Sequence, residues 1–290
     1  MKRIPALLTL LCIALLLFSG CAIPDSLPDI PALFQGGVRL PPAEKEKLPP
    51  AEEGLPPAEE DFQMPEVTVL PPEPEESPFD FPYDPEKPTM VLTFDDGPNA
   101  TLSPLLVEEL NARGVKASFF VLGINAERNR EVIELQYAGG HDVCSHGYDH
   151  QSKLTLLSEE ELAYQLEETA RVIREITGHE PPYVRPPYGA IDKTTAEKIP
   201  VPLMLWTLDP RDWENRDAEQ VRENILQNAF DGAVVICHDQ YESTLTGVLE
   251  AVDILLEQGW QFLSLSQYYQ SIGLEPQPGQ VYRGSQLADL

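Results

Sequence analysis

From Pro88 onward, short apolar runs alternate with longer stretches of helical character, and this alternation restricts the chain to one class of fold. The apolar runs are rich in Val, Leu, Ile and Phe, as strands are. They cover residues 90–94, 117–122, 142–145, 183–185, 203–208, 233–237 and 260–263. Strands that alternate with helices pair in a parallel sheet. We therefore predict an α/β fold in which about seven parallel strands curl into a distorted barrel.

The stretches between the apolar runs carry the signals of helix starts and ends. Ser158 stands three residues before Glu161, and Asp217 stands three residues before Gln220, which is the spacing of a capped helix start. Glycines follow several of the expected ends. The predicted helices span residues 103–113, 126–137, 159–177, 218–229 and 244–258.

Residues 1–21 have the order of an export signal. A basic start is followed by an apolar run from Ala6 to Phe18 and then by small residues up to Cys21. This order is typical of a secretory signal, and the run is shorter than the about 20 residues of a membrane span. The end of the segment resembles the lipobox of bacterial lipoproteins, in which the Cys becomes a lipidated N-terminus. Ordinary cleavage and an uncleaved anchor are the alternatives, and each places the rest of the chain outside the cytoplasm.

Residues 22–87 are dominated by Pro and Glu, and Leu-Pro-Pro-Ala-Glu occurs there three times, beginning at Leu40, Leu48 and Leu55. Such a composition cannot bury enough apolar surface to offset the entropy of ordering. Prolines and repelling carboxylates favour an extended chain of about 3 Å per residue. We predict a disordered stalk, with a Pro-rich ligand for an aromatic groove as the alternative.

The formal net charge of −28 argues against nucleic acid as a partner, because phosphate binding needs clustered Lys and Arg. It argues equally against a basic face that docks on anionic lipid. Of the four cysteines, only Cys144 and Cys237 lie beyond the signal, and both stand in apolar strand-like runs. They suit small buried hydrophobes, and the sequence leaves open whether they are bridged.

Polar motifs stand directly after five of the predicted strands. In parallel α/β folds the carboxyl ends of the strands meet at one edge, so these motifs are expected to share a site. Each motif alone has an ordinary explanation, such as a turn, an ion pair or a core histidine. Polar motifs with unrelated structural roles would have no reason to occur together at one edge of the sheet. The motifs contain Asp95-Asp96, His146 with His150, Arg185, Asp209 to Trp213, and His238.

Two imidazoles four residues apart, together with a carboxylate, are ligands that a borderline divalent ion prefers. Two His and one Asp leave a coordination position open for water. The set His146, His150 and an aspartate of the Asp95-Asp96 pair therefore indicates a hydrolytic metal site. We assign His141 and His179 to the structure, because one precedes a strand and the other follows a helix.

The ordered motifs resemble those of the polysaccharide deacetylase family, the NodB-homology domain of carbohydrate esterase family 4. The resemblance covers residues 88–270 and leaves 271–290 as a polar C-terminal tail. Two departures, Gly147 in place of Ser or Thr and Ile236 in place of Leu, leave the chemistry untouched. The matching segments are Thr93-Phe-Asp-Asp-Gly97, His146-x-x-x-His150, Arg185-Pro-Pro-Tyr-Gly189, Asp209-x-x-Asp-Trp213 and Ile236-Cys-His238.

The resemblance implies a metal-dependent polysaccharide N-deacetylase and a role for each motif residue. Asp96, His146 and His150 would bind a divalent metal, most often Zn²⁺, with Co²⁺ or another divalent ion as the alternative. Asp95 would act as general base, and Arg185 would hold its carboxylate. His238 would protonate the leaving amine, oriented by Asp212 in preference to Asp209. The backbone N–H of Tyr188 would meet the oxyanion, and Trp213 and Ile236 would enclose the acetyl methyl group.

The implied substrate is N-acetylglucosamine in a cell-surface polysaccharide, either peptidoglycan or chitin-type oligomers. Attachment by a stalk favours peptidoglycan and a membrane-anchored lipoprotein at the bacterial surface, with a secreted protein as the alternative. Two other functions stay open. An O-acetyl (xylan-type) esterase would share every motif, and a non-catalytic glycan-binding lipoprotein would have lost the base or the acid. The sequence leaves protein partners unknown.

Overall fold

A computed structural model of the chain describes residues 81–290. The predicted signal sequence, Cys21 and most of the predicted 22–87 stalk lie outside the described residues. The catalytic domain predicted over 88–270 lies within them, and its first strand begins at Thr89.

Four parallel strands form the main sheet, in the order β3-β2-β1-β5. They are β1 (Thr89–Asp95), β2 (Ala117–Val121), β3 (Asp142–Ser145) and β5 (Ala233–His238). All seven residues of β1 are buried, as expected for the central strand of a sheet that is covered on both faces. The short β6 (Gln261–Phe262) pairs with the first residues of β1. Sequence and structure agree on each of these strands to within a few residues.

Single bridges carry the sheet round to form a distorted α/β barrel, which confirms the predicted fold class. Ser145 at the end of β3 bridges Val184, and Val184 bridges the first residue of β4 (Leu203–Leu205). Leu208, just beyond β4, bridges Val235 of β5. The predicted 183–185 strand is reduced to a single bridging residue, Val184, because prolines at 181, 182, 186 and 187 have no N–H to donate to a ladder.

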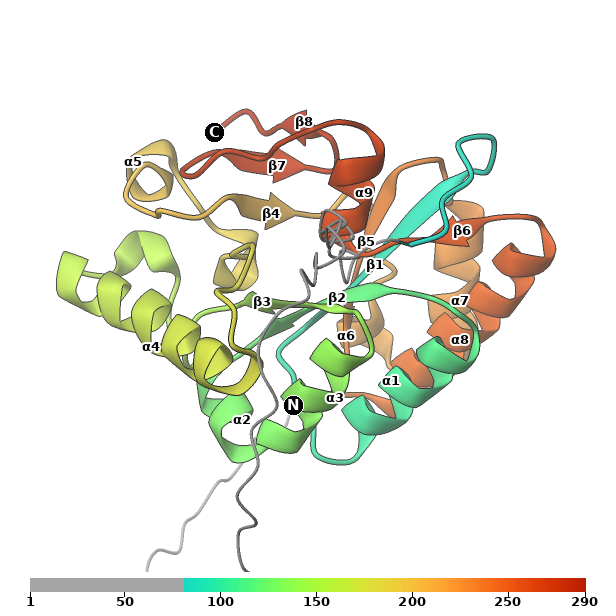
Figure 1. Cartoon of the computed structure of the whole chain (residues 1–290), viewed down its shortest axis with the longest axis horizontal. Helices are drawn as coiled ribbons and strands as arrows, with labels where there is room; N and C mark the ends of the chain where they lie inside the picture. The colour runs from blue at the N-terminus through green and yellow to red at the C-terminus, as the bar shows by residue number, and fades with distance from the viewer. Residues whose placement is uncertain (1–80) are drawn as a thin grey trace, which may run out of the picture. The chain divides into compact units, whose positions relative to one another are not determined.

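The prediction of a polar tail over 271–290 is wrong, because this segment completes the sheet beside β4. In it, β7 (Val281–Arg283) pairs with β4 in parallel, and β8 (Gln286–Leu287) pairs with β7 in antiparallel orientation. Val281 and Tyr282 are 3% and 5% exposed. Figure 1 shows β4, β7 and β8 as one layer near the C-terminus. This stretch has no more than two consecutive apolar residues, as at Val281 and Tyr282, so it lacks the longer apolar run that marks most of the predicted strands.

The larger helices pack on one another in the series α4, α3, α1, α8, α7, and Figure 1 shows this row curving along one side of β3, β2 and β1. Within residues 81–290, every helix is too short or too polar to cross a lipid bilayer. The helices are α1 (Leu102–Ala112), α2 (Gly123–Arg128), α3 (Arg130–Ala138), α4 (Glu159–Thr177), α5 (Lys193–Ala196), α6 (Asp212–Asn215), α7 (Ala218–Gln227), α8 (Glu242–Glu257) and α9 (Leu265–Ser271), with 3₁₀ turns at Leu154–Leu156 and Pro187–Gly189.

The predicted start signals of α4 and α7 are confirmed. Ser158 and Glu161 form a reciprocal capping box at α4, and the Asp217 side chain accepts a hydrogen bond from the Gln220 backbone at α7. Gly178 ends α4 in the left-handed conformation, with φ of 79°. The helix predicted over 126–137 is instead two helices, because Asn129 has non-helical backbone angles between α2 and α3.

Alternate residues of β1 face opposite sides of the sheet, and this alternation places the site. Met90, Leu92 and Phe94 pack in the larger apolar core together with residues of α1 and α8. Val91 belongs to the second core, with Phe120, Met204 and Tyr269. Thr93 and Asp95 share the face of Val91, so polar groups on that face point toward the interior of the barrel.

Candidate active site

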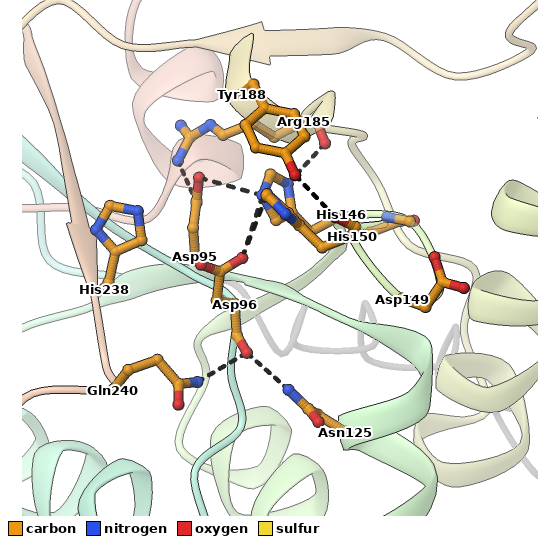
Figure 2. Close-up of polar contacts among 12 residues, drawn as sticks. Asp95, Asp96, Asn125, His146, Asp149, His150, Arg185, Tyr188, His238 and Gln240 are labelled. Carbon is orange, nitrogen blue, oxygen red and sulfur yellow. Dashed lines mark hydrogen bonds and ion pairs between the residues drawn. The ribbon is translucent and has the colours of Figure 1, made fainter. Parts of the chain in front are cut away.

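All five polar motifs meet at the carboxyl ends of the strands. Asp95 closes β1 and His238 closes β5, and the parallel register places these two residues side by side. His146 follows β3 directly. The motif side chains border a cavity of about 310 Å³, and Figure 2 shows several of them, among them Asp95, Asp96 and His238. Its lining comprises Asp95, Asp96, His146, His150, Tyr188, Gly189, Trp206, Asp209, Trp213, Ile236 and His238.

Asp96, His146 and His150 form a group that could hold a metal ion, since their ligand atoms all lie within 4.8 Å of one another. Asp96 Oδ1 lies 3.6 Å from His146 Nε2 and 3.7 Å from His150 Nε2. This oxygen is buried and has no hydrogen-bond partner among the described residues. A buried carboxylate oxygen without a donor is costly, and a cation between it and the two imidazoles would satisfy it. The donor set therefore fits a divalent ion.

The surroundings of His146 prepare it as a ligand. Its Nδ1 lies 2.8 Å from the backbone carbonyl oxygen of Arg185. Since a carbonyl can only accept, Nδ1 carries the proton and Nε2 keeps its lone pair. Burial lowers the pKa of His146, more than the charges of Asp95 and Asp96 raise it. The neutral imidazole that a metal ion requires is thereby favoured.

His150 is held from its backbone and from its ring. Its φ of 58° is in the left-handed region, and its carbonyl oxygen accepts a hydrogen bond of 3.1 Å from the Tyr188 hydroxyl. The Tyr188 and His150 rings pack with centroids 4.4 Å apart. Tyr188 thus lies beside a candidate metal ligand while its own side chain is 57% exposed at the rim of the cavity.

Asp95 is paired with a fully buried arginine. One guanidinium nitrogen, Nη1 of Arg185, lies 2.7 Å from Asp95 Oδ1 and 2.7 Å from Thr93 Oγ1, and Nε donates to the carbonyl oxygen of Met204. The guanidinium also lies 4.0 Å from the centroid of the Phe120 ring. Buried charges are tolerated when they are paired, and this pair fixes the Asp95 carboxylate at the wall of the cavity.

Asp212, rather than Asp209, contacts His238. Asp212 is fully buried, and its Oδ1 lies 3.0 Å from His238 Nδ1. Its Oδ2 accepts hydrogen bonds from the His238 backbone N–H at 2.7 Å and from Thr244 Oγ1 at 2.8 Å. Asp209 is exposed and accepts a hydrogen bond from the Arg211 backbone. The structure therefore agrees with the preference for Asp212.

The Asp212 contact changes the acidity of His238. Burial lowers the pKa of His238, but the hydrogen bond and the charge of Asp212, together with the charges of Asp95 and Asp96, outweigh burial and raise the pKa to about 9. His238 is consequently protonated at neutral pH and can give up a proton from Nε2 into the cavity. A carboxylate that orients an imidazolium in this way is the arrangement of a general acid.

The apolar side of the cavity contains the predicted Trp213 and Ile236, and also Trp206, which the sequence analysis missed. Trp206 lies within the predicted 203–208 strand, so the sequence pattern indicates a strand residue and not a cavity residue. A Cβ atom at Gly189 would lie 2.7 Å from its indole ring, and Gly189 has a φ of 62°. The only available signal was Gly189 itself, which permits a backbone to approach a bulky ring closely.

The two other histidines and the two cysteines lie away from this group. His141 accepts a hydrogen bond from the Ala117 backbone, and burial, with a smaller effect of Lys116, lowers its pKa to about 3. His179 stacks on Tyr137. Cys144 and Cys237 are free and buried, one on β3 and one on β5, with β2 and β1 between them in the sheet. None of these residues lines the cavity.

Comparisons with known proteins agree with this geometry. Residues 83–200 match the family model of polysaccharide deacetylases. The chain is 37% identical over 180 residues to the peptidoglycan-N-acetylglucosamine deacetylase PgdA of Listeria monocytogenes, covering 62% of this chain and 38% of PgdA. It is 32% identical over 200 residues to a peptidoglycan-N-acetylglucosamine deacetylase of Bacillus cereus, covering 67% of this chain and 72% of that protein.

A solved structure shows the same fold. The peptidoglycan deacetylase PdaC from Bacillus subtilis matches with a TM-score of 0.64 and 31% identity, over 66% of this chain and 94% of the PdaC chain. The match thus extends over nearly the whole PdaC domain. Against PgdA, in contrast, the chain spans well under half of the relative's length.

Proposed function

The chain belongs to the polysaccharide deacetylase family, and from this membership we propose that it is a metal-dependent hydrolase that removes N-acetyl groups from N-acetylglucosamine residues of peptidoglycan and releases acetate. The observation that carries the proposal is the pairing of Asp95 and His238. These neighbours at the ends of β1 and β5 face one cavity together with the Asp96, His146 and His150 group. A base, an acid and a metal site on one cavity are the parts that amide hydrolysis needs.

In this proposal Asp96, His146 and His150 hold the cation, and Zn²⁺ suits two neutral imidazoles and one carboxylate. A divalent cation bound there polarises the acetamide carbonyl and lowers the pKa of a water molecule. The protein supplies the proton transfers. Asp95, fixed by Arg185, which also donates to Thr93, takes a proton from the attacking water. The imidazolium of His238, fixed by Asp212, gives a proton to the leaving nitrogen.

The remaining cavity residues bind the acetyl group. The backbone N–H of Tyr188 donates to the developing oxyanion, a role that the preceding Pro186 and Pro187 cannot fill. Trp213 and Ile236 enclose the methyl group, and Ile236 is 6% exposed. Trp206 extends the same apolar wall.

The choice of peptidoglycan is supported by the relatives, several of which are named as peptidoglycan deacetylases. A substrate in the cell wall requires an exported enzyme, and this agrees with residues 1–21 as an export signal. We propose further that Cys21 is lipidated, that 22–87 is a spacer, and that this anchor keeps the enzyme beside its substrate.

Acetate release by the purified full chain tests the proposal. The substrates are peptidoglycan, N-acetylglucosamine oligomers and acetylated xylan, each with a chelator and then with added Zn²⁺. We expect metal-restored release, fastest from peptidoglycan, and release at least about 100-fold slower from the matched Asp95→Asn chain. Preferential release from acetylated xylan would make the protein an O-acetyl esterase. If a folded and metal-loaded chain releases acetate from none of the three substrates, the proposed enzymatic activity is refuted and glycan binding is favoured.

A further inference from the structure

Asp96 has an unusual backbone conformation for a candidate metal ligand. Its φ of 70° lies in the left-handed region, which costs a non-glycine residue about 1 kcal/mol or more. The conformation is productive, because it coincides with Oδ1 facing His146 and His150 at 3.6 and 3.7 Å. A strained backbone persists only where the surroundings hold it in place.

Two side-chain amides hold the carbonyl group of Asp96. Asn125 Nδ2 donates to this oxygen at 2.9 Å, and Gln240 Nε2 donates to it at 2.8 Å (Figure 2). A carbonyl oxygen has two lone pairs, so these two donors satisfy it completely. Both side chains are half-buried, and neither contacts the candidate ligand atoms. Their contact is with the backbone that carries the ligand.

The two donors come from separate parts of the barrel. Asn125 belongs to α2, after β2, and its own carbonyl oxygen accepts a hydrogen bond of 2.9 Å from Asn129 Nδ2. Gln240 stands two residues after His238, beyond the end of β5. They reach Asp96 across sequence separations of 29 and 144 residues. The orientation of Asp96 is therefore fixed from two strand ends at once.

The turn after Asp96 is fixed as well. The carbonyl oxygen of Gly97 accepts a hydrogen bond of 3.0 Å from the Leu122 backbone. A Cβ atom at Gly97 would lie 2.5 Å from the buried carboxylate of Asp239, so the turn has no room to shift toward β5. The backbone carbonyl groups of both Asp96 and Gly97 are therefore held by hydrogen bonds.

We propose that Asn125 and Gln240 are positioning residues that set the metal affinity of the site by holding Asp96 in its left-handed conformation. The inference rests on the metal site of the proposed function. Outer partners of this kind alter metal affinity by about 10- to 100-fold when they are removed. Here the partners act on the backbone of the ligand instead of on its side chain.

Asn125→Leu and Gln240→Met test the proposal, because each replacement keeps the approximate shape and removes the donor without adding charge. The dissociation constants for Zn²⁺ and Co²⁺ are measured on the full chain by competition with a chromogenic chelator, without substrate. We expect about 10-fold weaker binding for each single variant and up to about 100-fold for the double variant. The visible absorption of the Co²⁺ form should change in the same order, since it reports the ligand geometry directly.

Gln261→Met is the matched control. Its amide is also half-buried and donates to backbone carbonyls, those of Asp84 and Lys87, at the opposite end of β1, about 20 Å from Asp95 at 3.3 Å per residue. Gln261→Met should lower stability without changing the metal affinity. His150→Ala is the control for the loss of a ligand.

The outcomes separate the two proposals. Metal affinities within twofold of wild type in a folded Asn125→Leu/Gln240→Met chain would overturn the positioning role, and so would an equal loss in Gln261→Met. If only Gln240→Met folds, a metal dissociation constant within twofold of wild type in that variant would overturn the positioning role. If the wild-type chain binds the metal but releases no acetate, the deacetylase proposal is refuted. The positioning role of Asn125 and Gln240 is then unaffected.

Discussion

Asp212→Asn isolates the electrostatic part of the contact between Asp212 and His238. Asparagine has nearly the same shape. Its amide oxygen, placed where Asp212 has Oδ2, can still accept hydrogen bonds from the His238 backbone and from Thr244. Its NH₂ group then faces His238 Nδ1, which must be unprotonated in order to accept. The variant therefore favours the neutral imidazole, whereas the wild-type carboxylate favours the imidazolium.

The size of the effect follows from the pKa of His238. Its rise from 6.5 to about 9 favours the imidazolium by about 3 kcal/mol, at about 1.4 kcal/mol for a pKa difference of one. In the variant the hydrogen bond to a carboxylate is gone and burial dominates, so we expect a pKa below 6.5. At pH 7 the ring is then mostly neutral, and the general acid is lost.

Stability should show the same change with a defined pH window. The folded pKa of His238 lies above the unfolded value, so its contribution to stability is complete below pH 6.5 and is lost as the pH rises through about 9. Asp212→Asn should therefore reduce the free energy of unfolding by about 2 to 3 kcal/mol at pH 7. The reduction should be much smaller at pH 10.

The assay is an NMR titration of His238 in metal-free, isotope-labelled protein, assigned with His238→Gln, together with urea unfolding at both pH values. Asp209→Asn is the control, because Asp209 is exposed and has no contact with His238 among the hydrogen bonds of residues 81–290. Equal His238 pKa values in wild type and Asp212→Asn would refute the electrostatic role of Asp212. So would a loss of stability that is the same at pH 7 and pH 10.

Three further predictions concern the base, a metal ligand and the C-terminal strands. Asp95→Asn should keep its metal content and lose kcat by about 100- to 10,000-fold in acetate release, and loss of the metal would contradict the separate roles of Asp95 and Asp96. His150→Ala should lower metal content and activity together, and an unchanged metal content by elemental analysis would rule out His150 as a ligand. Removal of residues 274–290 should lower the free energy of unfolding by several kcal/mol, at about 1.5 to 3 kcal/mol for each buried apolar side chain such as Val281. An unchanged urea midpoint would show that β7 does not support the fold.

The sequence alone predicted the α/β barrel because its main strands are continuous apolar runs, each between helices with readable ends. All seven residues of β1 are buried, and a strand that is buried on both faces is recognisable from its own apolar sequence. The candidate metal group was also predictable. His146 and His150 are close in sequence, and Asp96 follows a parallel strand of the same sheet, whose carboxyl end must lie near theirs.

The hairpin of β7 and β8 was not predictable, because its segment has no more than two consecutive apolar residues, as at Val281 and Tyr282, and so contains no apolar run. The break between α2 and α3 at Asn129 was missed for a related reason, since a single residue with irregular backbone angles leaves the hydrophobic pattern nearly intact. In both places the packing of distant segments decides the local conformation.

Sequence by itself determined which residues stand at the strand ends and what chemistry they can perform, because strand position and side-chain type are local properties. Only the tertiary structure decided how those residues are held. It placed Asp212 rather than Asp209 against His238, brought Arg185 to Asp95, and set Asn125 and Gln240 on the carbonyl of Asp96. These contacts join segments 26 to 144 residues apart, and their geometry depends on the closure of the barrel, which no local pattern encodes.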